Sequence, residues 1–164
     1  MKKIKNFIKE IISTIIMIFI ISFVVNYFRA PELDSNKLPL IEKTLLDGSK
    51  FTTKDINETI VIHFWATWCR VCKLEISNIE DLSKDTNVIT IAVNSGSNED
   101  IKAFMRERGL SFKVINDIDG VLSSKFKIEA FPTTIIYNQN KELSFVEIGY
   151  STTAGLKARV GLSR

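Results

Sequence analysis

The strongest constraint on the fold is a strand-like run that leads directly into the chain's only two cysteines. Residues 59–64 (TIVIHF) form a continuous β-branched and aromatic run, which is typical of a buried central strand. After Cys69 the apolar residues change to helical spacing, with Cys72, Ile76 and Ile79 on one face. The pattern predicts a strand, a turn and a helix. Cys69 is expected at the N-terminal end of this helix, exposed to solvent, and Cys72 is expected to face the core.

The spacing of the two cysteines suits thiol chemistry. Two intervening residues let the sulfur atoms close a small ring across the first turn of a helix, where free backbone N–H groups and the helix dipole favour a thiolate. Cys69 is therefore predicted as the nucleophile, and Cys72 as the thiol that resolves a mixed disulfide. A structural zinc site would need four Cys or His ligands, and the chain has two Cys and one His. Binding of Cu(I) by the two thiolates stays open as an alternative.

Shorter patterns predict a domain in which strands and helices alternate. The Asp47-Gly48 pair between apolar positions indicates an early hairpin. Residues 97–100 (SNED) resemble a capping box, and the helix that follows is expected to end at Gly109. Further strands are expected at 87–93, 112–115, 135–137 and 143–148, and further helices at 121–126 and 152–160. This order predicts an α/β sandwich with a mixed central sheet.

An apolar segment precedes this domain. Of the 18 residues from 11 to 28, 14 are apolar or aromatic, which is long enough to cross a bilayer core. Lysines lie before the run, so the N-terminus is expected in the cytoplasm and the domain outside. A cleaved signal peptide is the alternative, but no small-x-small cleavage site follows the run, because residues 26–29 are bulky and Pro31 comes just after Ala30. We therefore expect a cytoplasmic stub and transmembrane anchor (1–28), a polar linker (29–38) and a folded domain (39–164).

The positive charge belongs to the N-terminal segment. Residues 1–29 carry five Lys or Arg against one Glu, whereas the remainder carries 17 Lys or Arg against 18 Asp or Glu. A nucleic-acid-binding domain needs a basic face on its folded part. The nearly neutral domain therefore argues against a nucleic-acid partner.

The motifs together resemble the thioredoxin-like TlpA-type family. The resemblance rests on residues 64–69 (FWATWC), on Cys72-Lys73, and on the later residues 131–134 (FPTT), and it covers about residues 40–162. Segments 94–96, 114–121 and 149–150 are similar to the branch that includes the ScsD (suppressor of copper sensitivity) and DsbE-like oxidoreductases. The chain departs from the family in having Arg70-Val71 where a proline is usual between the cysteines. It also has His63 where relatives often carry an acidic or amide side chain.

The resemblance implies a thioredoxin fold and assigns roles around the cysteines. Pro132 matches the family's cis-proline, whose loop faces the cysteines and whose preceding backbone pairs with the substrate. Glu75 matches a glutamate near the buried sulfur and is a candidate proton acceptor for Cys72. His63 is a second candidate for this proton relay, with a hydrogen-bonded core histidine as the alternative.

The implied substrate surface and cellular setting complete the hypothesis. The expected substrate contacts surround the two cysteines: Trp68, Arg70, Val71, Phe131 and Thr133. Arg70 could also favour the Cys69 thiolate. The predicted protein is a thiol-disulfide oxidoreductase anchored by one helix in the inner membrane, with its domain in the periplasm and protein cysteines or disulfides as substrates. No cofactor is expected beyond the Cys69–Cys72 disulfide, and the family implies a DsbD-like transmembrane electron donor. A disulfide-forming oxidant and a non-catalytic copper-binding or redox-sensing module are the alternatives to a reductant.

Overall fold

The computed structural model describes residues 7, 9–18, 20–21 and 35–164. The chain divides into two compact units, 1–30 and 31–164. In the first unit the described residues are helical, and their apolar side chains, among them Ile11, Ile15 and Ile18, are exposed. Much of the predicted membrane-spanning run, residues 19 and 22–28, lies outside the described residues, as do residues 29–34 of the predicted linker. Within the described residues, no helix combines the length and the hydropathy that a membrane span requires.

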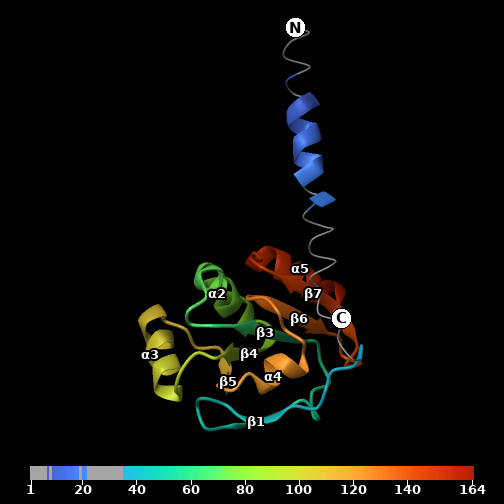
Figure 1. Ribbon diagram of the computed structural model, residues 1–164. Coiled ribbons are helices and arrows are strands. Elements are labelled where there is room, and N and C mark those ends of the chain that lie inside the picture. Colours follow the sequence, from blue (N-terminus) through green and yellow to red (C-terminus); the bar gives the residue numbers. More distant parts are fainter. Residues whose placement is uncertain (1–6, 8, 19, 22–34) are drawn as a thin grey trace. The chain divides into compact units, whose positions relative to one another are not determined.

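A five-stranded mixed sheet forms the centre of the second unit, as the alternating pattern predicts (Figure 1). The strand order is β5-β4-β3-β6-β7. The central strand β3 runs parallel to β4 and antiparallel to β6, and β4 runs parallel to β5. The strand bounds are β3 Ile60–Trp65, β4 Asn87–Val93, β5 Lys113–Asp117, β6 Thr133–Tyr137 and β7 Leu143–Ile148. The predicted strands at 87–93 and 143–148 are confirmed residue by residue.

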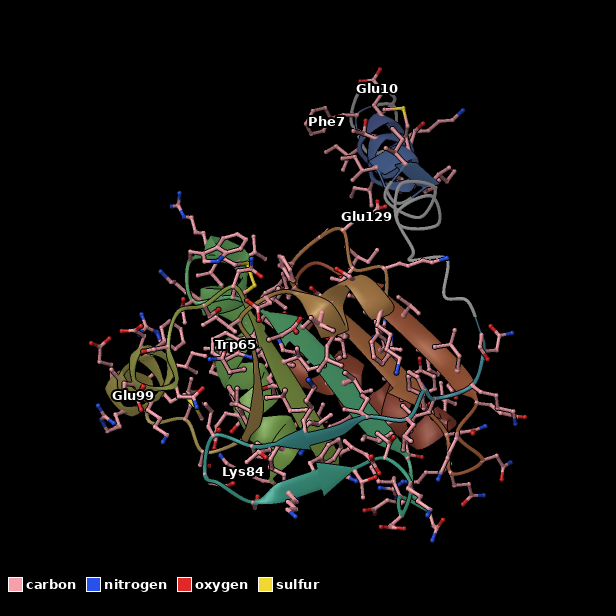
Figure 2. The ribbon with its side chains drawn as sticks, turned by 60° about the horizontal axis from the view of Figure 1, so that its bottom comes forward. Phe7, Glu10, Trp65, Lys84, Glu99 and Glu129 are labelled. Atoms are coloured by element: carbon pink, nitrogen blue, oxygen red, sulfur yellow. A yellow bond between two sulfur atoms is a disulfide. The ribbon has the colours of Figure 1, made fainter. Side chains whose placement is uncertain are left out.

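Both faces of the sheet are covered, which explains why β3 is apolar without interruption. Val61 and Trp65 contribute to the core under α2 (Arg70–Ser83), α3 (Asn98–Arg108) and α5 (Thr153–Leu162). Ile60, Ile62 and Phe64 contribute to the opposite core, which α4 (Val121–Lys125) closes. Because successive side chains of a strand point to opposite faces, His63 lies on the face that α2 covers. Figure 2 shows Trp65 inside the domain.

Local signals set the ends of the helices. α2 begins after Cys69, whose side chain accepts a hydrogen bond from the Cys72 backbone N–H. The predicted capping box at the start of α3 is present between Ser97 and Asp100, and Gly109 ends this helix in the left-handed conformation at a φ of 63°. A glycine at this position avoids the steric cost of a Cβ atom.

Two peripheral segments complete the edges of the sheet. The predicted hairpin is formed by β1 (Glu42–Thr44) and β2 (Lys50–Thr52), and its turn reaches the sheet where the Leu46 N–H donates to the Val114 carbonyl at 3.0 Å. At the opposite edge, the Leu38 N–H donates to the Lys141 carbonyl at 2.7 Å, and the Leu143 N–H donates to the Asn36 carbonyl at 2.6 Å. Residues 36–38, predicted as the end of the linker, are therefore part of the domain because their backbone pairs with the start of β7.

Candidate active site

The two cysteines form a disulfide at the first turn of α2, where Figure 2 shows the yellow sulfur–sulfur bond. Their Cα atoms are 5.3 Å apart. Cys69 is the residue that caps the helix, with extended backbone, and its Sγ accepts a hydrogen bond from the Cys72 N–H at 3.1 Å. An N–H that points at Sγ stabilises negative charge on this sulfur once the disulfide is opened. The predicted small ring across the first helical turn is therefore confirmed.

The exposure of Cys69 is lower than the sequence predicts. Its exposed fraction is 7%, and that of Cys72 is 1%. The order of the two sulfurs is as expected, but Cys69 is not open to solvent in the disulfide-bonded state. The physical reason is the closed ring itself, which holds the Cys69 sulfur against the first turn of α2. A partner therefore reaches the disulfide through a small exposed area.

A loop after β4 supports the turn that carries the cysteines. The Thr67 N–H donates to the Ser95 hydroxyl at 3.0 Å, and the Trp68 indole N–H donates to the Asn94 carbonyl at 3.0 Å. Ser95 is buried, and its hydroxyl donates in turn to the Val93 carbonyl. Sequence reasoning missed these two supporting residues. The available signal was the parallel pairing of β3 and β4, because the carboxyl ends of parallel strands meet at the same edge of a sheet.

The cis-proline expected from the family is present between Phe131 and Pro132. The Phe131 ring packs edge-on against Trp68 with ring centroids 5.7 Å apart, so this loop lies beside the cysteine turn. The Pro132 carbonyl accepts from the Gly149 N–H at 2.8 Å, which fixes the loop to the residue after β7. The structure therefore brings Phe131 and Pro132 to the site, as predicted.

Thr133 does not fit its predicted role as a substrate contact. Its side chain is buried in β6, and its hydroxyl donates to the Ala130 carbonyl at 2.8 Å. Its backbone pairs with Phe64 on one side and Ile148 on the other. Thr133 therefore closes the cis-proline turn from inside, because both its side chain and its backbone are already engaged.

Glu75 is a buried carboxyl group one helical turn after Cys72. Its Oε1 accepts a hydrogen bond from the Ser151 N–H at 2.9 Å, while Oε2 is buried without a hydrogen-bond partner among the described residues. Burial raises the pKa of Glu75 to about 7, although the hydrogen bond from Ser151 acts in the opposite direction. Glu75 can therefore exchange a proton near neutral pH.

His63 is fully buried at the centre of the sheet, between Thr90 and Thr134 in the strand register. Its Nδ1 lies 2.9 Å from the Thr134 hydroxyl, and its Nε2 has no hydrogen-bond partner in the described part of the chain. Burial lowers the pKa of His63 to about 3, so the imidazole is neutral at physiological pH. The geometry matches the alternative of a hydrogen-bonded core histidine.

The surface beside the disulfide is apolar with a basic border. Trp68 is 59% exposed, and Val71 and Leu74 are also exposed large apolar side chains. Arg70 and Lys73 are exposed on the same first turns of α2. Sequence reasoning missed Leu74, although its position three residues after Val71 places both on one face of the helix.

Metal-ligating side chains do not gather near the cysteines. No group of three or more His, Cys, Asp or Glu side chains that could hold a metal ion is found among the residues that the structure describes. His63 is on the sheet and is hydrogen-bonded to Thr134. The two sulfurs are therefore the only described soft ligands at this place in the fold.

A Cys-x-x-Cys disulfide that caps the helix after the central strand, beside a cis-proline loop, defines the thioredoxin class of proteins. The model of the AhpC/TSA family matches residues 35–146, and the chain belongs to this family. A "Thioredoxin-like protein" of Haemophilus influenzae is 27% identical over 163 residues, covering 96% of this chain and 95% of the relative.

One further relative is named for disulfide chemistry, and one solved structure shows the same fold. Sporulation thiol-disulfide oxidoreductase A of Bacillus subtilis is 26% identical, over 68% of this chain and 72% of the relative. The crystal structure of StoA from Bacillus subtilis superimposes with a TM-score of 0.68, at 20% identity, over 76% of this chain and 98% of StoA. The chain is accordingly a thiol-disulfide oxidoreductase of the thioredoxin family.

Proposed function

We propose that the chain is a membrane-anchored periplasmic thiol-disulfide oxidoreductase of the TlpA-type family, close to its ScsD and DsbE-like branch, that reduces disulfides in client proteins. The observation that carries the proposal is the Cys69–Cys72 disulfide at the first turn of α2, in which Cys69 is less buried than Cys72 and its sulfur accepts a hydrogen bond from the Cys72 N–H. The redox-active disulfide is the only redox group that the reaction needs.

The proposed reaction begins with the protein in its dithiol form. The Cys69 thiolate attacks a client disulfide, so a bond forms between Cys69 and one client sulfur while the other client sulfur leaves as a thiolate. Cys72 then loses its proton and attacks the Cys69 sulfur. The mixed disulfide breaks, the second client thiolate leaves, and the Cys69–Cys72 disulfide forms. The client gains two electrons, and the protein loses two.

Glu75 is the proton acceptor that we assign to the second step. It lies one helical turn from Cys72, one of its carboxylate oxygens has no hydrogen-bond partner among the described residues, and its pKa of about 7 suits proton exchange at working pH. His63 is the weaker candidate, because its Nδ1 is engaged with Thr134 and burial lowers its pKa to about 3.

Client proteins are proposed to dock on the apolar surface beside the disulfide. Trp68 and Val71 are exposed there, and Phe131 packs against Trp68 from the cis-proline loop. Apolar rings of this kind supply most of the binding energy in protein interfaces. The exposed Arg70 favours a client that carries an acidic residue near its cysteine.

The proposed membrane anchor is the apolar run of residues 11–28, which supports a single-pass inner-membrane location with the domain in the periplasm. A reductant in that compartment needs electrons from the cytoplasm, so a DsbD-like transmembrane donor is the proposed partner. Membrane fractionation of cells with and without residues 11–28 tests the location. Recovery of the full chain in the soluble fraction would contradict the anchor.

The function itself is tested by trapping clients in cells. The Cys72→Ser variant is expected to accumulate mixed disulfides through Cys69, whereas Cys69→Ser, the matched control, is not. Equilibration with glutathione then gives the direction of electron flow. A potential more oxidising than that of glutathione would indicate a disulfide-forming oxidant. Tight stoichiometric Cu(I) binding without any disulfide exchange would instead indicate a copper-binding module.

A further inference from the structure

A cavity of about 280 Å³ lies at the β5 edge of the sheet, between the hairpin turn, α3 and β5. Figure 1 shows α3 and β5 at this side of the domain, and the Leu46–Val114 hydrogen bond places the hairpin turn against β5. Its walls are mainly apolar and come from the hairpin turn, α3, the segment between α3 and β5, and β5 itself: Leu45, Leu46, Met105, Leu110, Phe112 and Val114. The cavity involves none of the residues placed in the active site.

The walls of the cavity are formed by the folded core. Leu45, Phe112 and Val114 are buried and belong to the two hydrophobic clusters on either side of the sheet. Glu80 of α2 accepts hydrogen bonds from the N–H groups of Ser111 and Phe112, which fixes the chain just before β5. The cavity therefore exists before a ligand arrives, and ligand binding costs little reorganisation.

Three cationic side chains line the cavity. Lys102 and Arg106 lie on one face of α3, at a spacing of four residues, and Lys113 reaches the cavity from β5. In the described part of the chain neither Lys102 nor Arg106 has an ion-pair partner. Asp47 is the one carboxylate in the lining, and it accepts hydrogen bonds from Ser49 and interacts with Lys113.

The size of the cavity limits what can occupy it. At about 30 Å³ for each molecule, 280 Å³ corresponds to about nine waters, at the small end of the range for ligand sites. This space holds one small molecule but no helix or strand of a partner protein. Apolar walls favour an apolar body, and Lys102 and Arg106 in the lining, which have no ion-pair partner among the described residues, favour a negatively charged end.

We propose that this cavity binds a small free carboxylate with an apolar chain, whose chain lies among Leu45, Met105 and Val114 and whose carboxylate meets Lys102 and Arg106. The site is separate from the disulfide and does not depend on the proposed redox function. A ligand bound there links the hairpin, α3 and β5.

Octanoate is the probe that tests the proposal, with octan-1-ol and octylammonium as uncharged and oppositely charged controls. Titration of the full chain in its disulfide form, followed by methyl NMR, is expected to give a dissociation constant of about 1 mM. The methyl shifts should be confined to the cavity walls. Octan-1-ol should bind several-fold more weakly, and octylammonium should not bind.

A pair of double variants separates the site from general charge effects. Lys102→Gln with Arg106→Gln is expected to weaken octanoate binding about fivefold. Lys84→Gln with Lys157→Gln removes one cation just after α2 and one from α5, both outside the cavity, and should leave binding unchanged. Equal binding by both double variants, methyl shifts confined to residues 11–21, or no saturation below about 10 mM would overturn the proposal. Disulfide exchange with glutathione, measured alongside, reports on the proposed function independently.

Discussion

Two buried titratable side chains, Glu75 of α2 and His63 of β3, have pKa values that burial shifts in opposite directions. Desolvation disfavours the charged form of each group, so the pKa of Glu75 rises to about 7 and that of His63 falls to about 3. Each has one polar atom without a hydrogen-bond partner among the described residues. A buried polar atom without a hydrogen-bond partner is costly to the folded state.

The first prediction concerns stability and pH. The folded pKa of Glu75 exceeds its unfolded value of 4.5. The contribution of Glu75 to the free energy of unfolding is therefore complete below pH 4.5 and is lost as the pH rises through 7. At about 1.4 kcal/mol for each tenfold change in proton affinity, the loss approaches about 3 kcal/mol above pH 7. Glu75→Gln should therefore show a flatter decline in unfolding free energy between pH 5 and pH 8 in urea titrations. An unchanged decline in this variant would contradict the shifted pKa.

The second prediction concerns the proton relay. Glu75→Gln is expected to slow resolution of a Cys69 mixed disulfide by Cys72 at least about tenfold at pH 7, because a general base is lost. The rate should recover as the pH approaches the pKa of the thiol. Stopped-flow measurement of model-disulfide release gives this pH profile. His63→Asn is the comparison: a loss there equal to that in Glu75→Gln would assign the relay to His63 instead.

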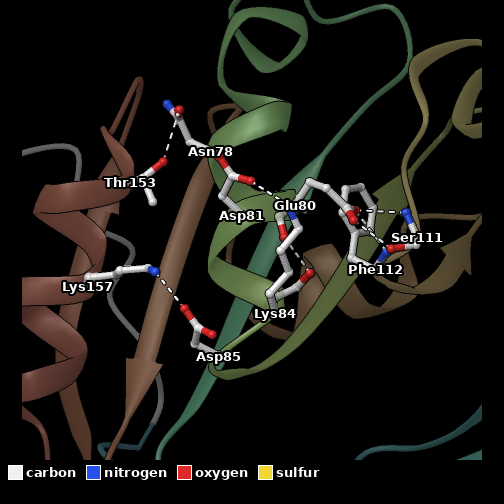
Figure 3. A network of polar contacts seen from close by, with 10 residues as sticks. Asn78, Glu80, Asp81, Lys84, Asp85, Ser111, Phe112, Thr153 and Lys157 are labelled. Atoms are coloured by element: carbon white, nitrogen blue, oxygen red, sulfur yellow. Dashed lines mark hydrogen bonds and ion pairs between the residues drawn. The ribbon is translucent and has the colours of Figure 1, made fainter.

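At the scale of elements, α2 is tied to its neighbours by polar contacts along its second half (Figure 3). Glu80 accepts from the N–H groups of Ser111 and Phe112 at 2.8 and 3.1 Å and from the Ser111 hydroxyl. On the other side, Thr153 of α5 donates to Asn78 of α2, and Lys157 of α5 pairs with Asp85, just after α2. These contacts hold the helix that presents the disulfide between α5 and the segment before β5.

The third prediction removes one of these ties. Glu80→Ala leaves two backbone N–H groups without their acceptor and is expected to destabilise the fold by about 1–3 kcal/mol. Asp81→Ala, on the next residue, breaks only an exposed ion pair with Lys84 and should cost less than about 0.5 kcal/mol. Urea denaturation followed by tryptophan fluorescence compares the two variants. Similar losses in both would show that Glu80 is no more than a surface charge.

Elements with complete local signals were predictable from the sequence. The continuous β-branched run at residues 87–93 predicts β4. The capping box of Ser97 and Asp100 predicts the start of α3, and Gly109 predicts its end. The support of the cysteine turn by Ser95 was not predictable, because it depends on contacts across 28 residues of sequence. The burial of Thr133 likewise follows from pairing with two strands, which no short motif encodes.

At the scale of the whole molecule, the strand order and the edge contacts follow from long-range pairing. Alternating strands and helices indicate a mixed sheet, but the order β5-β4-β3-β6-β7 places β3 at the centre through pairing with both β4 and β6. Residues 36–38 are also placed by long-range pairing, although their polar composition predicts a linker. Their backbone instead pairs with the start of β7, about a hundred residues later in the chain.

The last prediction tests whether this N-terminal segment belongs to the folded domain. Leu38 is 9% exposed and packs in the core under β7, whereas Leu40, two residues on, is 55% exposed. Leu38→Ala in the full chain should therefore lower the free energy of unfolding by about 2 kcal/mol, because buried apolar contacts are lost. Leu40→Ala is the matched control and should change it by less than about 0.5 kcal/mol. Equal urea midpoints for the two variants would show that residues 36–38 contribute nothing to the domain, and that the polar linker extends to Leu38 as the composition predicts.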